Sequence, residues 1–198
     1  MQHDVKPGLR RGDALLIVDV QIDFCPGGAL PVAGGDAVVP VLNRWIAAAR
    51  RADVPVYASR DWHPLGHVSF VSQGGEWPAH CVQDTPGARH HPDLALPEDT
   101  VPVYKGARLD RDQYSAFADT GLAKHLAAAG VERVFIGGLA LDVCVRATAL
   151  DARKHGFEVH LIEDATRPVD PAAGRATLEE LERAGVVLES SGEGEVSS

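Results

Sequence analysis

The stretch VERVFIGGLALDVCVRATALDARKHGFEVHLIED, residues 131–164, decides the fold. It begins with a β-rich run at 131–138 and leads straight into an alanine-rich helical segment over roughly 141–155. A second β-rich run follows at 157–164. Strands that alternate with helices at this spacing are typical of a parallel sheet. The stretch therefore predicts an α/β protein.

The same alternation continues on both sides of this stretch. Further strands are predicted at 14–20, 54–60, 100–105 and 186–190, and further helices at 37–51, 121–130 and 171–185. Helices on both faces of a mostly parallel, six-stranded sheet make a three-layer sandwich. The long loop between the strand at 54–60 and about residue 98 is expected to be functional. We expect one domain over residues 1–190 and a disordered tail over 191–198.

The composition excludes several classes of protein. A chain of 198 residues that is 45% hydrophobic is large enough for one domain with a real core. No apolar run approaches the roughly 20 residues of a membrane helix, and the N-terminal segment lacks a signal-peptide core, so we expect a cytoplasmic protein with no membrane partner. A net charge of −9 without a basic patch argues against nucleic acid as a partner. The oligomeric state stays open.

Reactive side chains follow four of the predicted strands. Asp19 ends the first strand, Asp61 and His63 follow the second, Lys105 ends the third, and Cys144 follows the fourth. Ligands of open α/β sheets bind outside the carboxyl ends of the strands. An acid, a metal-type cluster, an amine and a thiol are therefore expected to meet at one edge of the sheet.

Cys144 is a candidate nucleophile. Three cysteines, an odd number, do not indicate a disulfide framework. In the first turn of a helix the helix dipole favours the thiolate, and an ammonium from Lys105 would lower the thiol pKa further. Asp19 could take the thiol proton, and the N–H groups of Ala140 and Cys144 could hold an oxyanion. The alternatives are a buried, inert cysteine and a plain surface lysine.

The long loop carries one carboxylate and three imidazoles in DWHPLGHVSF (61–70) and WPAHC (77–81), namely Asp61, His63, His67 and His80. Such a set suits one divalent ion, and the residues do not choose among zinc, iron and manganese. The alternative is a chance cluster of histidines on a solvated loop. His90 and His91, in RHHPD, are interpreted in that way.

Two other chemistries that use a thiol or this fold are excluded. A cysteine phosphatase needs an arginine six residues after its nucleophile, and that position is Leu150. No G-x-G-x-x-G opens a helix after the first strand, which argues against a dinucleotide oxidoreductase.

Together, DVQIDFCPGGALPVAGG, DWHPLGHVSF, WPAHCVQDTPGARHHPDL, YKGARLDRDQYSAF and GLALDVCVRATALDA resemble the nicotinamidases of the isochorismatase-like cysteine hydrolases. The resemblance runs in order from about residue 14 to residue 165. It implies the isochorismatase-like, Rossmann-like fold. It also implies hydrolysis of nicotinamide, with pyrazinamide as a second substrate and NAD salvage as the biological role.

The resemblance also implies a role for individual residues. The catalytic triad is Asp19, Lys105 and Cys144, the oxyanion hole is formed at Ala140 and Cys144, and the metal ligands are Asp61, His63 and His80. His67 matches a fourth metal-associated position that only some members use. Phe24 and Trp77 match the aromatic residues that sandwich the substrate ring, and Tyr114 and Ala140 match further pocket positions. The Leu139–Ala140 bond matches a cis peptide bond, and Leu141 departs from the threonine of many members.

Three rival functions stay open. One is another hydrolase of the superfamily that acts on a carbamoyl, ureido or vinyl-ether substrate, although such members generally lack the loop cluster. A second is a hydrolase in which a metal-bound hydroxide attacks and Cys144 is a bystander. The third is a binding protein on this fold without catalytic activity.

Overall fold

Residues 8–190 are described by this computed structural model. Six strands form one sheet in the order β3-β2-β1-β4-β5-β6, and each pair of neighbours is parallel. The strands are β1 (Asp13–Val18), β2 (Val56–Asp61), β3 (Val101–Lys105), β4 (Arg133–Leu139), β5 (Glu158–Arg167) and β6 (Val187–Glu189). The helices are α1 (Val38–Arg51), α2 (Leu122–Ala128), α3 (Arg146–Lys154) and α4 (Pro171–Arg183). The predicted α/β fold with a six-stranded sheet is confirmed.

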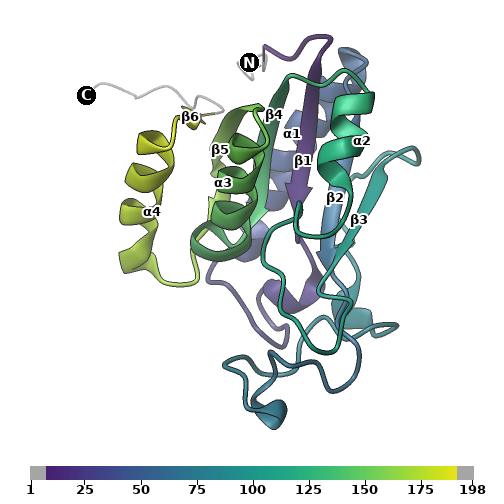
Figure 1. Cartoon of the computed structure of the whole chain (residues 1–198), viewed down its shortest axis with the longest axis vertical. Coiled ribbons are helices and arrows are strands. Elements are labelled where there is room, and N and C mark those ends of the chain that lie inside the picture. The colour runs from purple at the N-terminus through teal and green to yellow at the C-terminus, as the bar shows by residue number, and fades with distance from the viewer. Residues whose placement is uncertain (1–7, 191–198) are drawn as a thin grey trace.

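The helices divide the core into two layers. On one face α1 packs against the sheet, and on the other face α2, α3 and α4 do so (Figure 1). The central strand β1 is buried along its whole length, since its sequence DALLIV serves both layers. Its Leu15 and Ile17 face α1, whereas Leu16 and Val18 join the opposite core. The three-layer sandwich follows from this two-sided burial.

The strand order reverses between β1 and β4, which are neighbours in the centre of the sheet. Such a switch point leaves a crevice outside the carboxyl ends of the strands, because the connections on its two sides leave in opposite directions. The strands point toward the lower part of Figure 1, where the loops after β1, β2 and β3 gather. Asp19 follows β1 and Cys144 follows β4, so the two flank this crevice.

Two predicted elements differ from the structure at their ends. The strand predicted at 14–20 stops at Val18, because Asp19 takes a left-handed backbone with φ of 49°. The helix predicted over 141–155 begins as a π-helical turn, η5 (Leu141–Val145), and becomes α-helical only in α3. Both differences lie beside the crevice, where the chain departs from regular geometry to place a side chain.

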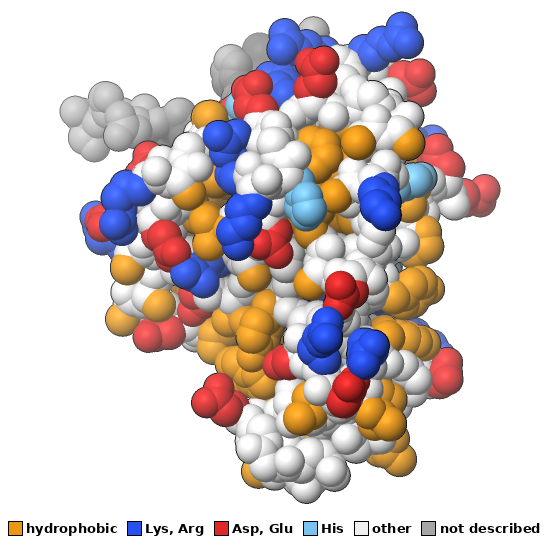
Figure 2. Space-filling view, in the orientation of Figure 1, with side chains coloured by type: hydrophobic (Ala, Val, Ile, Leu, Met, Phe, Trp, Pro, Cys, Tyr) orange, Lys and Arg blue, Asp and Glu red, His pale blue; other side chains and the backbone are white. Residues whose placement is uncertain are grey.

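Short 3-10 turns lie in the loops: η1 (Ile22–Phe24), η2 (Gly35–Ala37), η3 (Val71–Gln73) and η4 (Pro86–Ala88). No helix within residues 8–190 is long and apolar enough to cross a membrane. The predicted disordered tail, 191–198, lies outside the described residues, as do residues 1–7. On the face drawn in Figure 2, acidic and basic side chains are interspersed, and hydrophobic side chains gather where the lower ends of the helices meet the loops.

Candidate active site

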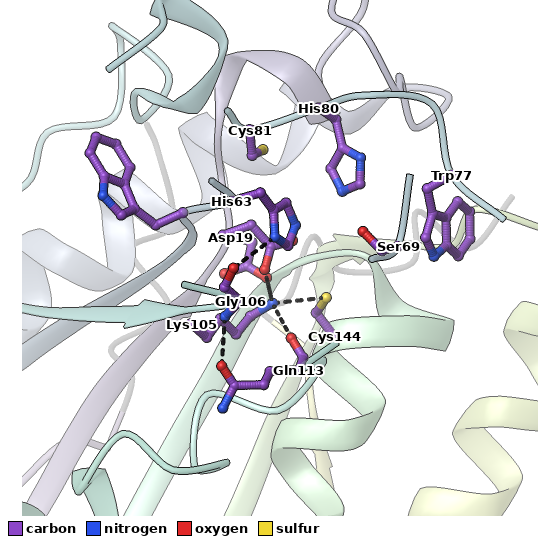
Figure 3. A network of polar contacts seen from close by, with 12 residues as sticks. Asp19, His63, Ser69, Trp77, His80, Cys81, Lys105, Gly106, Gln113 and Cys144 are labelled. Carbon is purple, nitrogen blue, oxygen red and sulfur yellow. Dashed lines mark hydrogen bonds and ion pairs between the residues drawn. The ribbon is translucent and has the colours of Figure 1, made fainter. Parts of the chain in front are cut away.

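The Lys105 ammonium is the centre of the site. Its Nζ lies 2.8 Å from Asp19 Oδ2 and 2.5 Å from Asp61 Oδ1. It also donates to Cys144 Sγ at 3.3 Å and to the Gln113 carbonyl at 3.3 Å (Figure 3). The predicted convergence of acid, amine and thiol therefore occurs, at the end of β3. Lys105 itself is buried and is not a surface lysine.

Burial and charge shift the pKa values of the two carboxylates in opposite directions. Burial raises the pKa of Asp19, against the opposing effect of Lys105. Burial also acts to raise the pKa of Asp61, but the Lys105 ammonium and His63 outweigh it and hold that pKa well below its usual range. Asp61 is therefore a permanent carboxylate, whereas Asp19 is a stronger base than a surface aspartate. The two carboxylates in turn raise the pKa of Lys105, despite its burial, well above the ordinary lysine value.

The thiol of Cys144 does not follow the expectation drawn from its helix. Burial raises its pKa well above that of a free cysteine, and the nearby Lys105 opposes this effect without reversing it. Cys144 is the fourth residue of the π-helical turn η5, so it does not sit at the open N-terminus of an α-helix. The resting site therefore holds a neutral thiol, and a base must remove its proton when it attacks.

Three predicted metal ligands lie together beside Lys105. One potential ligand atom from each of Asp61, His63 and His80 lies within 4.8 Å of the others, and all three residues are buried. His63 Nδ1 donates to the Gly106 carbonyl at 3.0 Å, and His80 Nδ1 donates to the Pro78 carbonyl at 2.7 Å. These bonds leave each Nε2 as the nitrogen available to a ligand.

The donor set fits a divalent ion of the kind that binds carboxylate and imidazole. Asp61 remains ionised, and burial lowers the pKa of His80, so both groups are held in the form that coordinates a metal. At His63 the Asp61 carboxylate outweighs burial and raises the pKa, so a metal would have to displace a proton from this ring. A second group of candidate ligand atoms, from Asp19, Asp61 and Cys144, surrounds the Lys105 ammonium. A cation is already present there, so the metal set is the one with the two histidines.

His67 lies beside Asp61, His63 and His80. Its ring is 4.2 Å from that of His63, centroid to centroid. Its Nε2 donates to the Arg111 carbonyl at 3.0 Å, and its Nδ1 lies 2.7 Å from Ser69 Oγ. Both ring nitrogens of His67 are therefore engaged in this structure, and its ring packs against that of His63.

A pocket opens onto Cys144, Asp61, His63 and His80. The four residues that the family resemblance implied for substrate binding all line this pocket: Phe24, Trp77, Tyr114 and Ala140. Trp77 Nε1 donates to the Tyr114 hydroxyl at 3.2 Å and so joins two loops across the pocket. The Leu139–Ala140 peptide bond is cis, as expected. An apolar pocket with a few converging polar groups suits a small aromatic ligand.

The similarity to known proteins extends over almost the whole chain. The model of the isochorismatase domain matches residues 13–193. The chain belongs to the isochorismatase family. The nicotinamidase of Escherichia coli (strain K12) is 39% identical to it, over 88% of this chain and 93% of the relative.

Two solved structures of this family resemble the isochorismatase domain described above. The pyrazinamidase of Pyrococcus horikoshii, in complex with zinc, has a TM-score of 0.88 and 47% identity over 90% of this chain and 99% of its own. PnC1 from L. infantum, in complex with nicotinate, has a TM-score of 0.87 and 45% identity over 91% and 93% of the two chains. The sequence resemblance to nicotinamidases is thereby confirmed.

Several residues of this isochorismatase-family site were missed by sequence reasoning. Ser59 Oγ donates to Asp19 Oδ1 at 2.7 Å, and Gln113 Oε1 accepts from the Gly106 N–H at 2.9 Å. A single hydroxyl or amide carries no sequence signal for such a role. The remaining pocket residues were also missed, namely Leu30, Pro31, Val32, Asp112, Val143 and Val169. They come from four segments far apart in the sequence, one of them η5, so only the tertiary structure brings them to one cavity.

Proposed function

We propose that this protein is a nicotinamidase that hydrolyses nicotinamide to nicotinate and ammonia, and that it also accepts pyrazinamide. The observation that carries the proposal is the buried Lys105 ammonium, which contacts Asp19, Cys144 and the metal ligand Asp61. This contact joins a nucleophile, a base and an anchor for the substrate in one cavity. The nicotinamidase and pyrazinamidase relatives support the same activity.

In the first half of the reaction, Asp19 takes the thiol proton while Cys144 attacks the carboxamide carbon. Because burial raises the pKa of Asp19, its carboxylate is suited to this task. The tetrahedral oxyanion is held by the N–H groups of Ala140 and Cys144 with help from Lys105. Asp19 then gives the proton to the leaving nitrogen, so that ammonia departs and a thioester remains on Cys144.

In the second half, Asp19 removes a proton from water, which attacks the thioester carbon. Nicotinate leaves, and the proton returns to the thiol of Cys144. Phe24 and Trp77 hold the ring, and stacking on each is worth roughly 0.5–1.5 kcal/mol. A divalent ion held by Asp61, His63 and His80 would bind the pyridine nitrogen, directly or through a water, and so orient the carboxamide. Its identity among zinc, iron and manganese is left open; the relative from P. horikoshii holds zinc.

The proposal includes one hydrolase domain over residues 1–190, a cytoplasmic location and a role in NAD salvage, which rest on the resemblance to nicotinamidases. It does not depend on whether the protein forms a homo-oligomer. The metal-hydroxide hydrolase remains its rival, since both need the same metal set.

The test is ammonia release from nicotinamide by the purified, metal-loaded protein. Cys144→Ala is expected to lose at least about 10³-fold in kcat, as removal of a nucleophile does. Cys25→Ala is the matched control, because Cys25 is also buried but does not line the cavity, and it is expected to keep full activity. Removal of the metal with a chelator should also abolish turnover.

Each other outcome has a definite meaning. Activity that survives in Cys144→Ala but disappears with the chelator would assign the attack to a metal-bound hydroxide. A metal-loaded wild-type protein that releases no ammonia from nicotinamide would overturn the proposal.

A further inference from the structure

The end of β2 lacks a strand partner on one side. The last backbone bond between β2 and the segment that contains β1 is made by Ser59, whose carbonyl accepts from the N–H of Asp19, the residue after β1, at 3.2 Å. Since Asp19 turns into the left-handed region, β1 leaves the sheet there. The backbone N–H and C=O of Asp61 point to the same side as those of Ser59, because residues two apart in a strand are equivalent. Both groups would be buried without partners.

The side chain of Gln21 takes the place of the missing strand. Its Oε1 accepts from the Asp61 N–H at 2.8 Å, and its Nε2 donates to the Asp61 carbonyl at 2.9 Å. The second hydrogen of Nε2 is donated to the Ala88 carbonyl at 3.0 Å. Gln21 is wholly buried, so all of these bonds are shielded from water. One amide therefore fixes both backbone polar groups of Asp61, its N–H and its C=O.

Asp23, two residues after Gln21, bonds the backbone next to another proposed ligand, His80. Its Oδ2 accepts from the Cys81 N–H at 2.7 Å, immediately after His80. Cys81 has a left-handed backbone with φ of 46°, which is unusual for a residue other than glycine. The Cys81 carbonyl in turn accepts from the His63 N–H at 3.0 Å. Asp23 thus holds a strained residue that lies between two ligands.

The other oxygen of the Asp23 carboxylate is also bonded. Its Oδ1 accepts from the Ala29 N–H at 3.2 Å. A Cβ atom on Gly87 would lie only 2.2 Å from Asp23 Oδ2, so the glycine is what allows the two segments to cross. Asp23 is therefore packed into one position against the loop that carries His80.

We propose that Gln21 and Asp23 are positioning residues of the metal site. Gln21 sets the direction of Asp61, and Asp23 sets that of His80 through the backbone of Cys81. This inference rests on the proposed function in that it takes Asp61, His63 and His80 as the ligands. Neither residue touches the ion or the substrate; each acts on the ligands through the backbone.

The expected effect is on metal affinity. Removing an outer partner of a metal ligand typically lowers affinity by about 10- to 100-fold, because the ligand must then be ordered at the moment of binding. We expect this loss in Gln21→Leu, which keeps the volume and removes all three bonds, and in Asp23→Ala. Gln21→Glu keeps the acceptor for the Asp61 N–H and loses both donors, so it is expected to weaken binding as well. Asp23→Asn keeps an acceptor oxygen for the Cys81 N–H and loses only the acceptor for the Ala29 N–H, so affinity is expected to stay within about threefold of wild type.

The measurement is the dissociation constant for Zn²⁺, by competition with a chromophoric chelator, on apo-protein whose fold is verified by circular dichroism. The visible spectrum of the Co²⁺-loaded variants reports the geometry of the ligands as a second readout. Asn43→Ala is the matched control, because Asn43 also bonds backbone on both sides, donating to the Asp93 carbonyl and accepting from the Ala95 N–H, each at 2.8 Å. Its loss is expected to lower stability and to leave Zn²⁺ affinity unchanged.

Wild-type Zn²⁺ affinity in all folded variants, with an unchanged Co²⁺ spectrum, would overturn the inference. An equal loss of affinity in Asn43→Ala would do so too, since the effect would then come from general destabilisation. If Gln21→Leu fails to fold, Gln21→Glu and the pair Asp23→Ala and Asp23→Asn decide. A wild-type protein that binds no Zn²⁺ would instead count against the metal anchor of the proposed function.

Discussion

At the scale of single residues, the site is governed by how burial and charge compete at each group. Lys105 stays an ammonium because two carboxylates lie against it, although burial alone would favour its neutral form. Cys144 lies beside the same ammonium, yet burial dominates and its thiol stays protonated. The direction of each pKa shift depends on which charged groups lie next to the side chain, and the residue type alone does not reveal these.

His90 offers a test of this competition away from the metal ligands. Burial, aided by the Arg60 guanidinium and opposed by a bond to the Val20 carbonyl, lowers its pKa to about 4. Its Nδ1 is buried without a hydrogen-bond partner in the described part of the chain. The folded protein therefore holds His90 neutral at a pH where the unfolded chain, with a pKa near 6.5, binds a proton.

Stability from His90 is accordingly present above pH 6.5 and is lost as the pH falls toward 4. The unfolding free energy of the wild type is expected to fall between pH 7 and pH 5, and in His90→Gln this fall should be smaller by about 2 kcal/mol. Urea unfolding at the two pH values, with chelator present, measures it. Arg60→Gln should make the fall in unfolding free energy smaller as well, but by less, because it removes one of the causes that lower the pKa of His90. An unchanged loss in His90→Gln would show that another group is responsible.

At the scale of elements, the turn after β3 connects Lys105 of the proposed triad to His63 of the proposed metal site. Gly106 follows Lys105 with φ of 63°, and its carbonyl holds His63 Nδ1. A Cβ atom at this position would lie 2.4 Å from His63 Cε1, closer than real contacts allow. The glycine thus serves both the backbone turn and the imidazole that packs on it.

Gly106→Ala is expected to destabilise the protein by more than the roughly 1–2 kcal/mol of a left-handed alanine, since His63 must also move. Zn²⁺ affinity should fall with it. Gly74→Ala is the matched control, because Gly74 has φ of 86° and nothing within 4 Å of its Cβ position. Urea unfolding and chelator competition on both variants measure the two effects. If the two variants lost the same unfolding free energy and the same Zn²⁺ affinity, the contact between residue 106 and His63 would be unimportant.

At the scale of the whole molecule, the two ends of the sheet have separate tasks. The carboxyl ends carry the proposed catalytic residues and metal ligands, whereas at the amino ends an ion pair joins two strands. There Arg133 Nε and Nη2 donate to the two oxygens of Asp13, each at 2.7 Å, and the Asp13 carboxylate is almost fully buried. This pair ties β1 to β4 at the end away from the crevice.

Arg133→Met is therefore expected to lower the unfolding free energy by about 3 kcal/mol, because the buried Asp13 carboxylate loses its counter-charge and keeps only the bond from the Arg10 N–H. The kcat/KM for nicotinamide, measured below the unfolding transition, should stay within about twofold of wild type. A large fall in kcat/KM with the fold intact would show that the two ends of the sheet are coupled.

The sequence by itself determined the elements and the candidate residues. Apolar runs of strand length alternate with helical ones, and that pattern is enough to predict a sheet covered on both faces. Because parallel strands share one carboxyl edge, it also placed Asp19, Lys105 and Cys144 at one site. The metal set followed from Asp61 and the histidines of one loop.

Only the tertiary structure decided what each of these groups meets. The raised pKa of Cys144, the bond of His67 to the Arg111 carbonyl, and the bonds of Gln21 and Asp23 to the loop backbone all depend on contacts between segments far apart in the chain. The local sequence pattern predicts periodicity and burial, since these depend on residues that are neighbours in the sequence. A pKa, or a hydrogen bond to a distant backbone, is set by neighbours in space.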